Sequence, residues 1–238
     1  MANPYFKFKK FIIFQDNCAM KVGTDGVLLG SWTPIYDAET ILDIGSGTGL
    51  ISLMLAQRSY KAKVLGVELD TNAYIQSLDN IKLSPWSDRV NVVNTDFRDY
   101  STEGGLYDLI VSNPPYFINS KLAPDNTRSI ARHTSFLSYT ELIDGVLRNL
   151  KPSGYFSIIL PAQNFEYFSL KAKLKGLFEI QRLMVYPTPY KAVSRILSLW
   201  TRQEIETVKQ QSLILEIGGR HNYSPEYLSL TKEFYLKV

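Results

Sequence analysis

The chain has 238 residues, of which 45% are hydrophobic, a formal net charge of +3 and one cysteine, Cys18. This length and apolar content suffice for one large buried core, and nothing demands a second domain. A single cysteine excludes an internal disulfide, and without His or Cys neighbours we expect it to be a small apolar residue rather than a metal ligand. No stretch resembles a signal peptide or membrane span, so we expect a cytoplasmic protein that binds neither membrane nor metal.

Residues 1–34 are predicted to form a basic, aromatic extension with a capping helix, ahead of a globular domain over 35–238. Lysines alternate with aromatic residues near its start, and four lysines stand against one acid in the first stretch of the chain. Lys7, Lys9 and Lys10 are therefore candidate contacts for RNA phosphates, beside rings that suit unstacked bases. A half-buried edge strand whose lysines face water explains the same pattern, and the two interpretations are compatible.

A strand, a glycine turn and a helix are predicted in succession after this extension. Thr24 or Asp25 is expected to cap the preceding helix. The apolar run 40–44 leads into Gly-Ser-Gly-Thr-Gly at 45–49, and helix-forming residues follow at 50–56. Glycines let the backbone approach a ligand closely, and a helix N-terminus favours electronegative groups. The spacing departs from the dinucleotide fingerprint Gly-x-Gly-x-x-Gly, so the turn alone identifies no cofactor.

The next strands also end in polar side chains. The second strand ends at Glu68, which can accept hydrogen bonds from ribose hydroxyls. The third leads to Asp96 and Phe97, where the acid can accept an adenine amino group while the ring packs on the purine. Each acid alone is more often a helix cap or a solvated loop residue. Because ligands of open α/β sheets bind where the carboxyl ends of the strands meet, the ordered set predicts one nucleoside site.

The fourth strand, residues 107–112, runs into Asn113-Pro114-Pro115-Tyr116. An asparagine oxygen and a backbone carbonyl can accept hydrogen bonds from both N–H groups of a planar amino group. Two prolines stiffen the loop, and a tyrosine offers a flat face to a heteroaromatic ring. An ordinary strand-ending turn explains these four residues equally well when they are considered alone.

The polar stretch 117–137 is long for a connector, which favours either a substrate lid or a solvated excursion. The candidate substrate contacts there are Phe117, Arg128, Arg132 and His133. The pattern after it predicts a helix over 138–150, a strand over 155–160, a lysine-rich helix around 163–175 and two closing antiparallel strands at 177–186 and 195–202. Arg195, at the connection between those two strands, is a further candidate RNA contact.

These motifs resemble, in order, those of class I S-adenosylmethionine-dependent methyltransferases. The resemblance implies a Rossmann-like, three-layer α/β fold, with a mostly parallel seven-stranded sheet whose last strand is antiparallel. It also implies S-adenosylmethionine as cofactor and an amino acceptor: adenine N6, guanine N2 or a glutamine amide. The residues predicted to contact the cofactor are Lys21, Gly23, Thr24, Asp43, Gly45, Gly47, Gly49, Glu68, Leu69, Asp96, Phe97 and Asn113.

A second resemblance covers nearly the whole chain. The aromatic and lysine-rich start, Met20–Gly26, Ile130–His133 and Glu233–Lys237 are similar to the bacterial tRNA1(Val) adenine N6-methyltransferase family. That family implies methyl transfer to N6 of adenosine 37 in a tRNA anticodon loop, with the catalytic loop at 113–116. We expect the enzyme to act as a monomer.

Two other classes stay open at this point. An enzyme with the same Asn-Pro-Pro-Tyr loop could methylate a protein glutamine, or adenine or guanine in ribosomal RNA or DNA. A protein-directed enzyme would be expected to carry an additional helical recognition domain. The second class is a non-catalytic RNA-binding protein that keeps a methyltransferase fold. Intact Gly45, Glu68, Asp96 and Asn113 favour an enzyme over that class.

Overall fold

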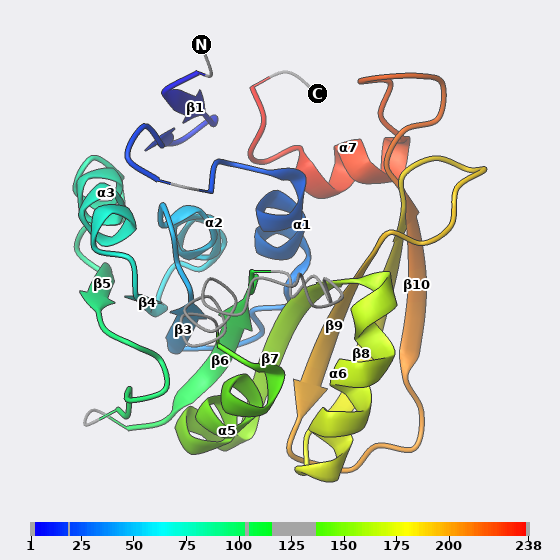
Figure 1. The fold of residues 1–238 in the computed structure, drawn as a ribbon. Helices are drawn as coiled ribbons and strands as arrows, with labels where there is room; N and C mark the ends of the chain where they lie inside the picture. Colours follow the sequence, from blue (N-terminus) through cyan, green and yellow to red (C-terminus); the bar gives the residue numbers. More distant parts are fainter. Residues whose placement is uncertain (1–2, 19, 103–104, 116–136, 237–238) are drawn as a thin grey trace, which may run out of the picture.

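The computed structural model of the chain describes residues 3–18, 20–102, 105–115 and 137–236, and forms a three-layer α/β arrangement (Figure 1). The helices of one outer layer are α1 (Thr24–Trp32), α2 (Leu50–Arg58) and α3 (Thr71–Lys82), while α5 (Tyr139–Asn149) and α6 (Ala162–Leu174) form the other. The strand order of the main sheet is β10 (Lys209–Ile214), β8 (Phe178–Tyr186), β9 (Arg195–Thr201), β7 (Leu150–Pro161), β6 (Tyr107–Ser112), β3 (Thr40–Ile44), β4 (Lys63–Glu68) and β5 (Val90–Asn94).

The predicted mixed sheet is confirmed, with one strand more than the seven expected. Strand β9 runs antiparallel to both of its neighbours, whereas the other pairings are parallel. The additional strand β10 pairs in parallel with β8 at the sheet edge. Its first four residues are exposed and polar, so the sequence carried no apolar run that would have marked it as a strand.

Apolar side chains of the central strands are buried on both faces of the sheet. Successive residues of a strand point to opposite sides, and accordingly Ile41 belongs to the core beneath α1 and α2, while Leu42 belongs to the core beneath α5 and α6. Both side chains are fully buried. The sheet therefore holds its ligand-binding loops on a support that is packed on both sides.

The N-terminal residues form a separate hairpin of β1 (Tyr5–Lys7) and β2 (Ile12–Phe14). It packs against the C-terminal end of the chain, beyond α7 (Pro225–Thr231): Phe8 bridges to Tyr235, and the backbone N–H of Lys9 donates to the carbonyl of Phe234. Phe8 and Phe11 are buried. For these two rings the interpretation as exposed platforms for bases is therefore wrong, because both are buried in the core, where Phe8 stacks on Tyr235. Tyr5 of the same stretch is 44% exposed. Lys7, Lys9 and Lys10 do face solvent.

Asn80 fastens this N-terminal segment to the main domain. Its side-chain oxygen accepts from the backbone N–H of Phe14 at 2.8 Å, and its amide nitrogen donates to the carbonyls of Phe14 and Thr48, both at 2.9 Å. The side chain is fully buried. Because Thr48 belongs to the glycine turn, one residue on α3 holds both the hairpin and that turn in place.

The expected helix at 24–32 is present as α1, but neither Thr24 nor Asp25 caps it. Gly23, which has no side chain to accept from the free amides, occupies the N-cap position. Thr24 and Asp25 are the first helical residues, so their side chains are too far along the helix to serve as the cap. The Asp25 carboxylate instead accepts a hydrogen bond from Arg195.

Candidate functional site

The carboxyl ends of β3 and β6 border a cavity of about 450 Å³. Parallel strands bring these ends to the same edge of the sheet, where open α/β folds bind ligands. Of the predicted site residues, the lining includes Lys21, Gly23, Thr24, Gly45, Gly47, Asn113, Pro114 and Arg195. It also includes residues that sequence reasoning did not select: Met20, Val22, Asp25, Gly26, Ser46, Thr48, Leu50 and Ile51.

Three glycines of the turn after β3 have left-handed backbone conformations, with φ of +70° at Gly45, +56° at Gly47 and +81° at Gly49. A Cβ atom built on Gly45 or Gly47 would meet no protein atom within 4 Å. At Gly49 it would meet the hydroxyl of Ser77 at 2.8 Å. The first two glycines therefore leave open space beside the cavity, and the third allows α2 to begin close against α3.

Glu68, at the end of β4, braces the glycine turn. One carboxylate oxygen accepts from the backbone N–H of Gly47 and the other from that of Asp70, both at 2.8 Å. Asp70 in turn caps α3 by accepting from the amide of Ala73. Neither Glu68 nor its exposed neighbour Leu69 lines the cavity. The acid thus connects two helix starts at the same sheet edge.

Asp43 lies buried beneath the glycine turn. Its Oδ2 accepts from the backbone N–H and the hydroxyl of Ser52, at 3.1 and 2.7 Å, while Oδ1 has no hydrogen-bond partner. Burial, with a smaller contribution from the nearby charge of Glu68, raises the pKa of this carboxyl to about 7. The turn therefore rests on a titratable group with one unsatisfied oxygen.

Asp96 and Phe97 both make contacts within the protein in this structure. The Asp96 carboxylate forms an ion pair with Arg98, and the hydrogen bonds from Arg98 hold the pKa of Asp96 below its ordinary value. The Phe97 ring is only 5% exposed and packs against Gly145 of α5, where a Cβ atom would collide with it. Since glycine leaves that space on α5, the ring fills the core instead of projecting from the sheet edge.

The acceptor loop begins directly at the cavity. Asn113 is half-buried, Pro114 is buried and Pro115 is exposed, and the first two line the cavity. Tyr116, Phe117, Arg128, Arg132 and His133 lie outside the described residues. Lys7, Lys9 and Lys10 belong to the N-terminal hairpin and do not line the cavity.

A cation–anion pair forms part of the lining of the same cavity. Arg195 Nε donates to Asp25 Oδ2 at 2.9 Å, and Arg195 Nη1 donates to the carbonyl of Ser194 at 3.0 Å. The two partners are 170 positions apart in the chain, so no local pattern announces the pair. The acid in the first turn of α1 was the only available signal, and it suits a helix start equally well.

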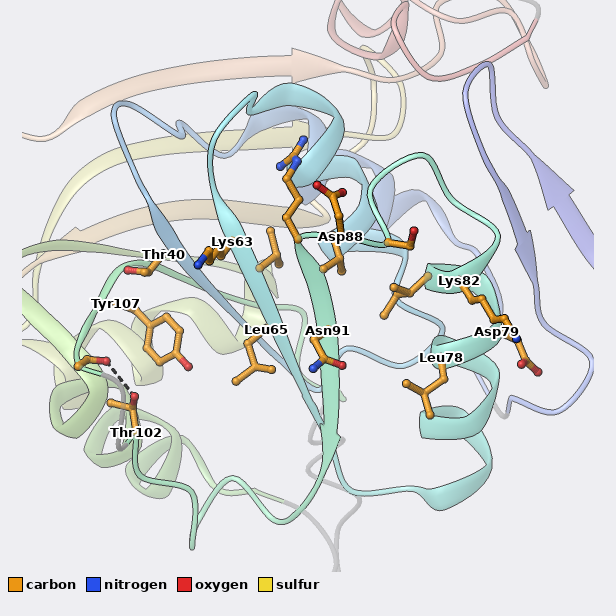
Figure 2. A pocket seen from close by; sticks show the side chains of 16 residues that line it. Thr40, Lys63, Leu65, Leu78, Asp79, Lys82, Asp88, Asn91, Thr102 and Tyr107 are labelled. Carbon is orange, nitrogen blue, oxygen red and sulfur yellow. Dashed lines mark hydrogen bonds between the residues drawn. The ribbon is translucent and has the colours of Figure 1, made fainter.

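A larger cavity, of about 720 Å³, lies at the opposite edge of the sheet (Figure 2). Its lining includes Thr40, Lys63, Val90 and Tyr107, which are the first residues of their strands. Among the residues that the structure describes, none of those expected to bind cofactor or acceptor lines it. The larger of the two cavities is therefore not the one beside the glycine turn and Asn113.

Two predicted absences concern metal sites and membrane spans, and the structure bears on them over residues 3–18, 20–102, 105–115 and 137–236. There, no group of three or more His, Cys, Asp or Glu side chains could hold a metal ion. Among the same residues, no helix has the length and apolar character needed to cross a membrane. Cys18 is buried, as expected, and this burial raises the pKa of its thiol to about 11.

The chain matches known proteins over its whole length. Residues 23–186 match the family model of the methyltransferase small domain. A tRNA1(Val) (adenine(37)-N6)-methyltransferase of Bacteroides fragilis is 47% identical, and the alignment covers 100% of both chains. Proteins of the same name from Tolumonas auensis and Flavobacterium johnsoniae are 43% and 40% identical, covering 100% and 98% of this chain and 99% and 100% of theirs.

Solved structures share the fold at low sequence identity. A predicted O-methyltransferase of Agrobacterium tumefaciens superposes with a TM-score of 0.66 at 18% identity, covering 88% of this chain and 96% of that one. TYW2 of Pyrococcus horikoshii, in complex with MeSAdo, superposes with a TM-score of 0.58 at 19% identity, covering 84% of this chain and 71% of that one. These likenesses establish the Rossmann-like methyltransferase fold.

Proposed function

The chain belongs to the family of tRNA1(Val) (adenine(37)-N6)-methyltransferases, and from this premise we propose that it transfers a methyl group from S-adenosylmethionine to N6 of adenine 37 in that tRNA. The observation that carries the proposal is 47% identity with a protein of that name over the full length of both chains. Full coverage matters because the similarity includes the hairpin and the C-terminal residues as well as the cofactor-binding core.

The cavity beside the glycine turn suits the cofactor. Gly45 and Gly47 leave open space at the cavity, and the buried Asp43 Oδ1 beneath the turn has no partner. We assign Gly45 and Gly47 to close backbone contact with the cofactor, Lys21 and Thr24 to its amino-acid end, and Glu68 to the ribose. The bound cofactor supplies an electrophilic methyl group on a positively charged sulfur.

Asn113 and Pro114 are assigned to the acceptor. The lone pair of an exocyclic adenine nitrogen is delocalised into the ring, so the amino group is a poor nucleophile. Hydrogen bonds from its two N–H groups to the Asn113 oxygen and the Pro114 carbonyl would fix its direction and favour pyramidal nitrogen. The main contribution of the loop is then positioning, with the nitrogen in line with the methyl group.

No strong base is assigned, because the nitrogen becomes acidic only as the methyl group is transferred. The proton can leave to water. The target base must be unpaired or flipped out, and an anticodon loop supplies such bases. Tyr116 is assigned to stack on the base, and the exposed Lys7, Lys9 and Lys10 are assigned to the tRNA backbone. The proposed unit is a monomer.

The test is methyl transfer from isotopically labelled S-adenosylmethionine to total tRNA that lacks the modification, followed by mapping of the labelled nucleoside. We expect N6-methyladenosine at position 37 of tRNA1(Val). Asn113→Ala is expected nearly to abolish transfer while the cofactor Kd changes little, because the main role assigned to this side chain is to hold the acceptor amino group. Label in protein, or in N2-methylguanosine, would overturn the proposal.

A further inference from the structure

The ion pair between Asp25 and Arg195 joins two elements that line the cavity. Asp25 lies in the first turn of α1, and Arg195 is the first residue of β9. The side chains are 21% and 31% exposed, so the pair is half-buried but open to the cavity that both residues line. Such a pair fixes the direction of a guanidinium better than solvent does.

The backbone around Arg195 is also held firmly. The carbonyl of Ser194, which accepts from Arg195 Nη1, accepts in addition from the backbone N–H of Ala162 at 3.1 Å. The amide of Ser194 donates to the carbonyl of Val185 at 2.9 Å. The guanidinium therefore projects from a strand start that is tied to β8 and to the first residue of α6, directly after β7.

The strand order places Arg195 on the acceptor side of the site. Counted across the sheet, Glu68 ends β4, the glycine turn ends β3, Asn113 follows β6, and Arg195 begins β9 two strands beyond β6. Because β9 is antiparallel, its first residue lies at the edge where β7 ends. Two strand spacings correspond to about 10 Å, a distance comparable to the span between the amino group of a nucleotide and its own phosphate.

We propose that Arg195 binds the backbone phosphate next to the target adenine, and that Asp25 is the positioning residue that aims the guanidinium. This inference rests on the proposed function, since it takes RNA as the substrate. A planar guanidinium donates to carboxylate and phosphate oxygens in a fixed geometry. The target base is thereby held at two points, at its amino group by Asn113 and at its phosphate by Arg195.

The first test is the affinity for unmodified tRNA1(Val) across a salt series, measured for wild type, Arg195→Ala, Arg195→Lys and a matched control. Lys209→Ala is the control because it removes the same charge from the opposite edge of the sheet, at the start of β10. For Arg195→Ala we expect about tenfold weaker binding and a salt slope that is smaller by about 1. Arg195→Lys is expected to recover part of the affinity, because it restores the charge without the planar fork.

The second test separates positioning from attraction. Asp25→Asn removes a negative charge near the phosphate, which by itself would favour RNA binding, so we expect little change in tRNA affinity. The single-turnover rate at saturating tRNA and cofactor is expected to fall about tenfold, because a misdirected guanidinium misplaces the base. In the double variant with Arg195→Ala, Asp25→Asn should lower the rate no further.

The outcomes are distinguishable. Wild type that neither binds nor methylates the tRNA would overturn the proposed function and this inference together. Active wild type with unchanged tRNA affinity and salt slope in Arg195→Ala would overturn the inference alone. A weaker cofactor Kd with unchanged tRNA affinity would show instead that Arg195 binds the carboxylate of the cofactor. If Lys209→Ala lost as much tRNA affinity and salt slope as Arg195→Ala, the effect would be one of general electrostatics, and the inference would also be overturned.

Discussion

Adding one methyl group at Gly47 tests whether the glycine turn is the cofactor cradle. Gly47→Ala has a matched control in Gly176→Ala, because both glycines have left-handed φ, +56° and +87°, and open space where the Cβ atom would lie. Gly47 lines the cavity, whereas Gly176 lies in the turn between α6 and β8. The two substitutions thus impose the same backbone strain at two places.

The expected magnitudes follow from this geometry. A left-handed conformation costs a residue with a Cβ atom about 1–2 kcal/mol, so both variants should lose that much stability. For a chain of this size, the Tm should then fall by about 2–8 °C in each. In Gly47→Ala, the new methyl group also enters space assigned to the cofactor. Overpacking costs about 1–3 kcal/mol, which corresponds to a Kd about 5- to 150-fold weaker.

Thermal unfolding without cofactor and calorimetric titration with S-adenosylmethionine measure the two effects separately. We expect matching Tm losses and a weaker Kd in Gly47→Ala alone. If Gly47→Ala binds cofactor as wild type does, the turn is not in contact with it and the reasoning fails. If Gly176→Ala weakens binding equally, the loss reflects general destabilisation, and the assignment of the cradle loses its support.

Three further substitutions test other parts of the structure. Asp43 has a folded-state pKa of about 7, above the ordinary 3.8, so its contribution to stability falls as pH rises from about 4 to 7. Asp43→Asn should remove about 3 kcal/mol of the stability difference between pH 5 and pH 8, measured by urea unfolding at both pH values. Gly145→Ala should lower the free energy of unfolding by about 1–3 kcal/mol, because its methyl group collides with the Phe97 ring. An unchanged urea midpoint would show that the ring moves freely. Asn80→Ala should lower the free energy of unfolding by about 3 kcal/mol, because backbone groups of Phe14 and Thr48 lose their hydrogen-bond partner. Amide hydrogen exchange should also become faster in β2. Exchange that stays slow there would contradict the role of Asn80 in holding the hairpin to the main domain.

Local sequence patterns were sufficient for most of the fold. The strands ending at Ile44, Glu68 and Ser112 are short apolar runs followed by glycine or polar residues, and the structure forms each of them. The left-handed conformations of Gly45 and Gly47 follow equally from residue type, because only glycine adopts them without strain. Strand β10 escaped notice because its burial depends on β8, a neighbour that its own polar sequence does not reveal.

Features that depend on distant partners could not be predicted. Asp25 fits a helix cap by its position, and only the approach of β9 gives it Arg195 instead. Phe97 follows a strand as a purine-stacking ring would, but its direction depends on a glycine of α5 that lies far along the chain. The sequence indicates which residues have useful chemistry, whereas tertiary packing decides which of them meet.

The joining of the two ends has a consequence for synthesis. The hairpin at residues 5–14 packs against residues 234 and 235, and Lys9 bonds the carbonyl of Lys232, 223 positions later. At about 5–20 residues per second, those partners follow about 11–45 s after the hairpin itself. Throughout that interval Phe8 lacks the Tyr235 ring that stacks on it in the finished protein. A chain emerging from the ribosome therefore exposes an apolar N-terminal segment. We expect nascent chains halted before residue 230 to bind chaperones that the finished protein does not bind.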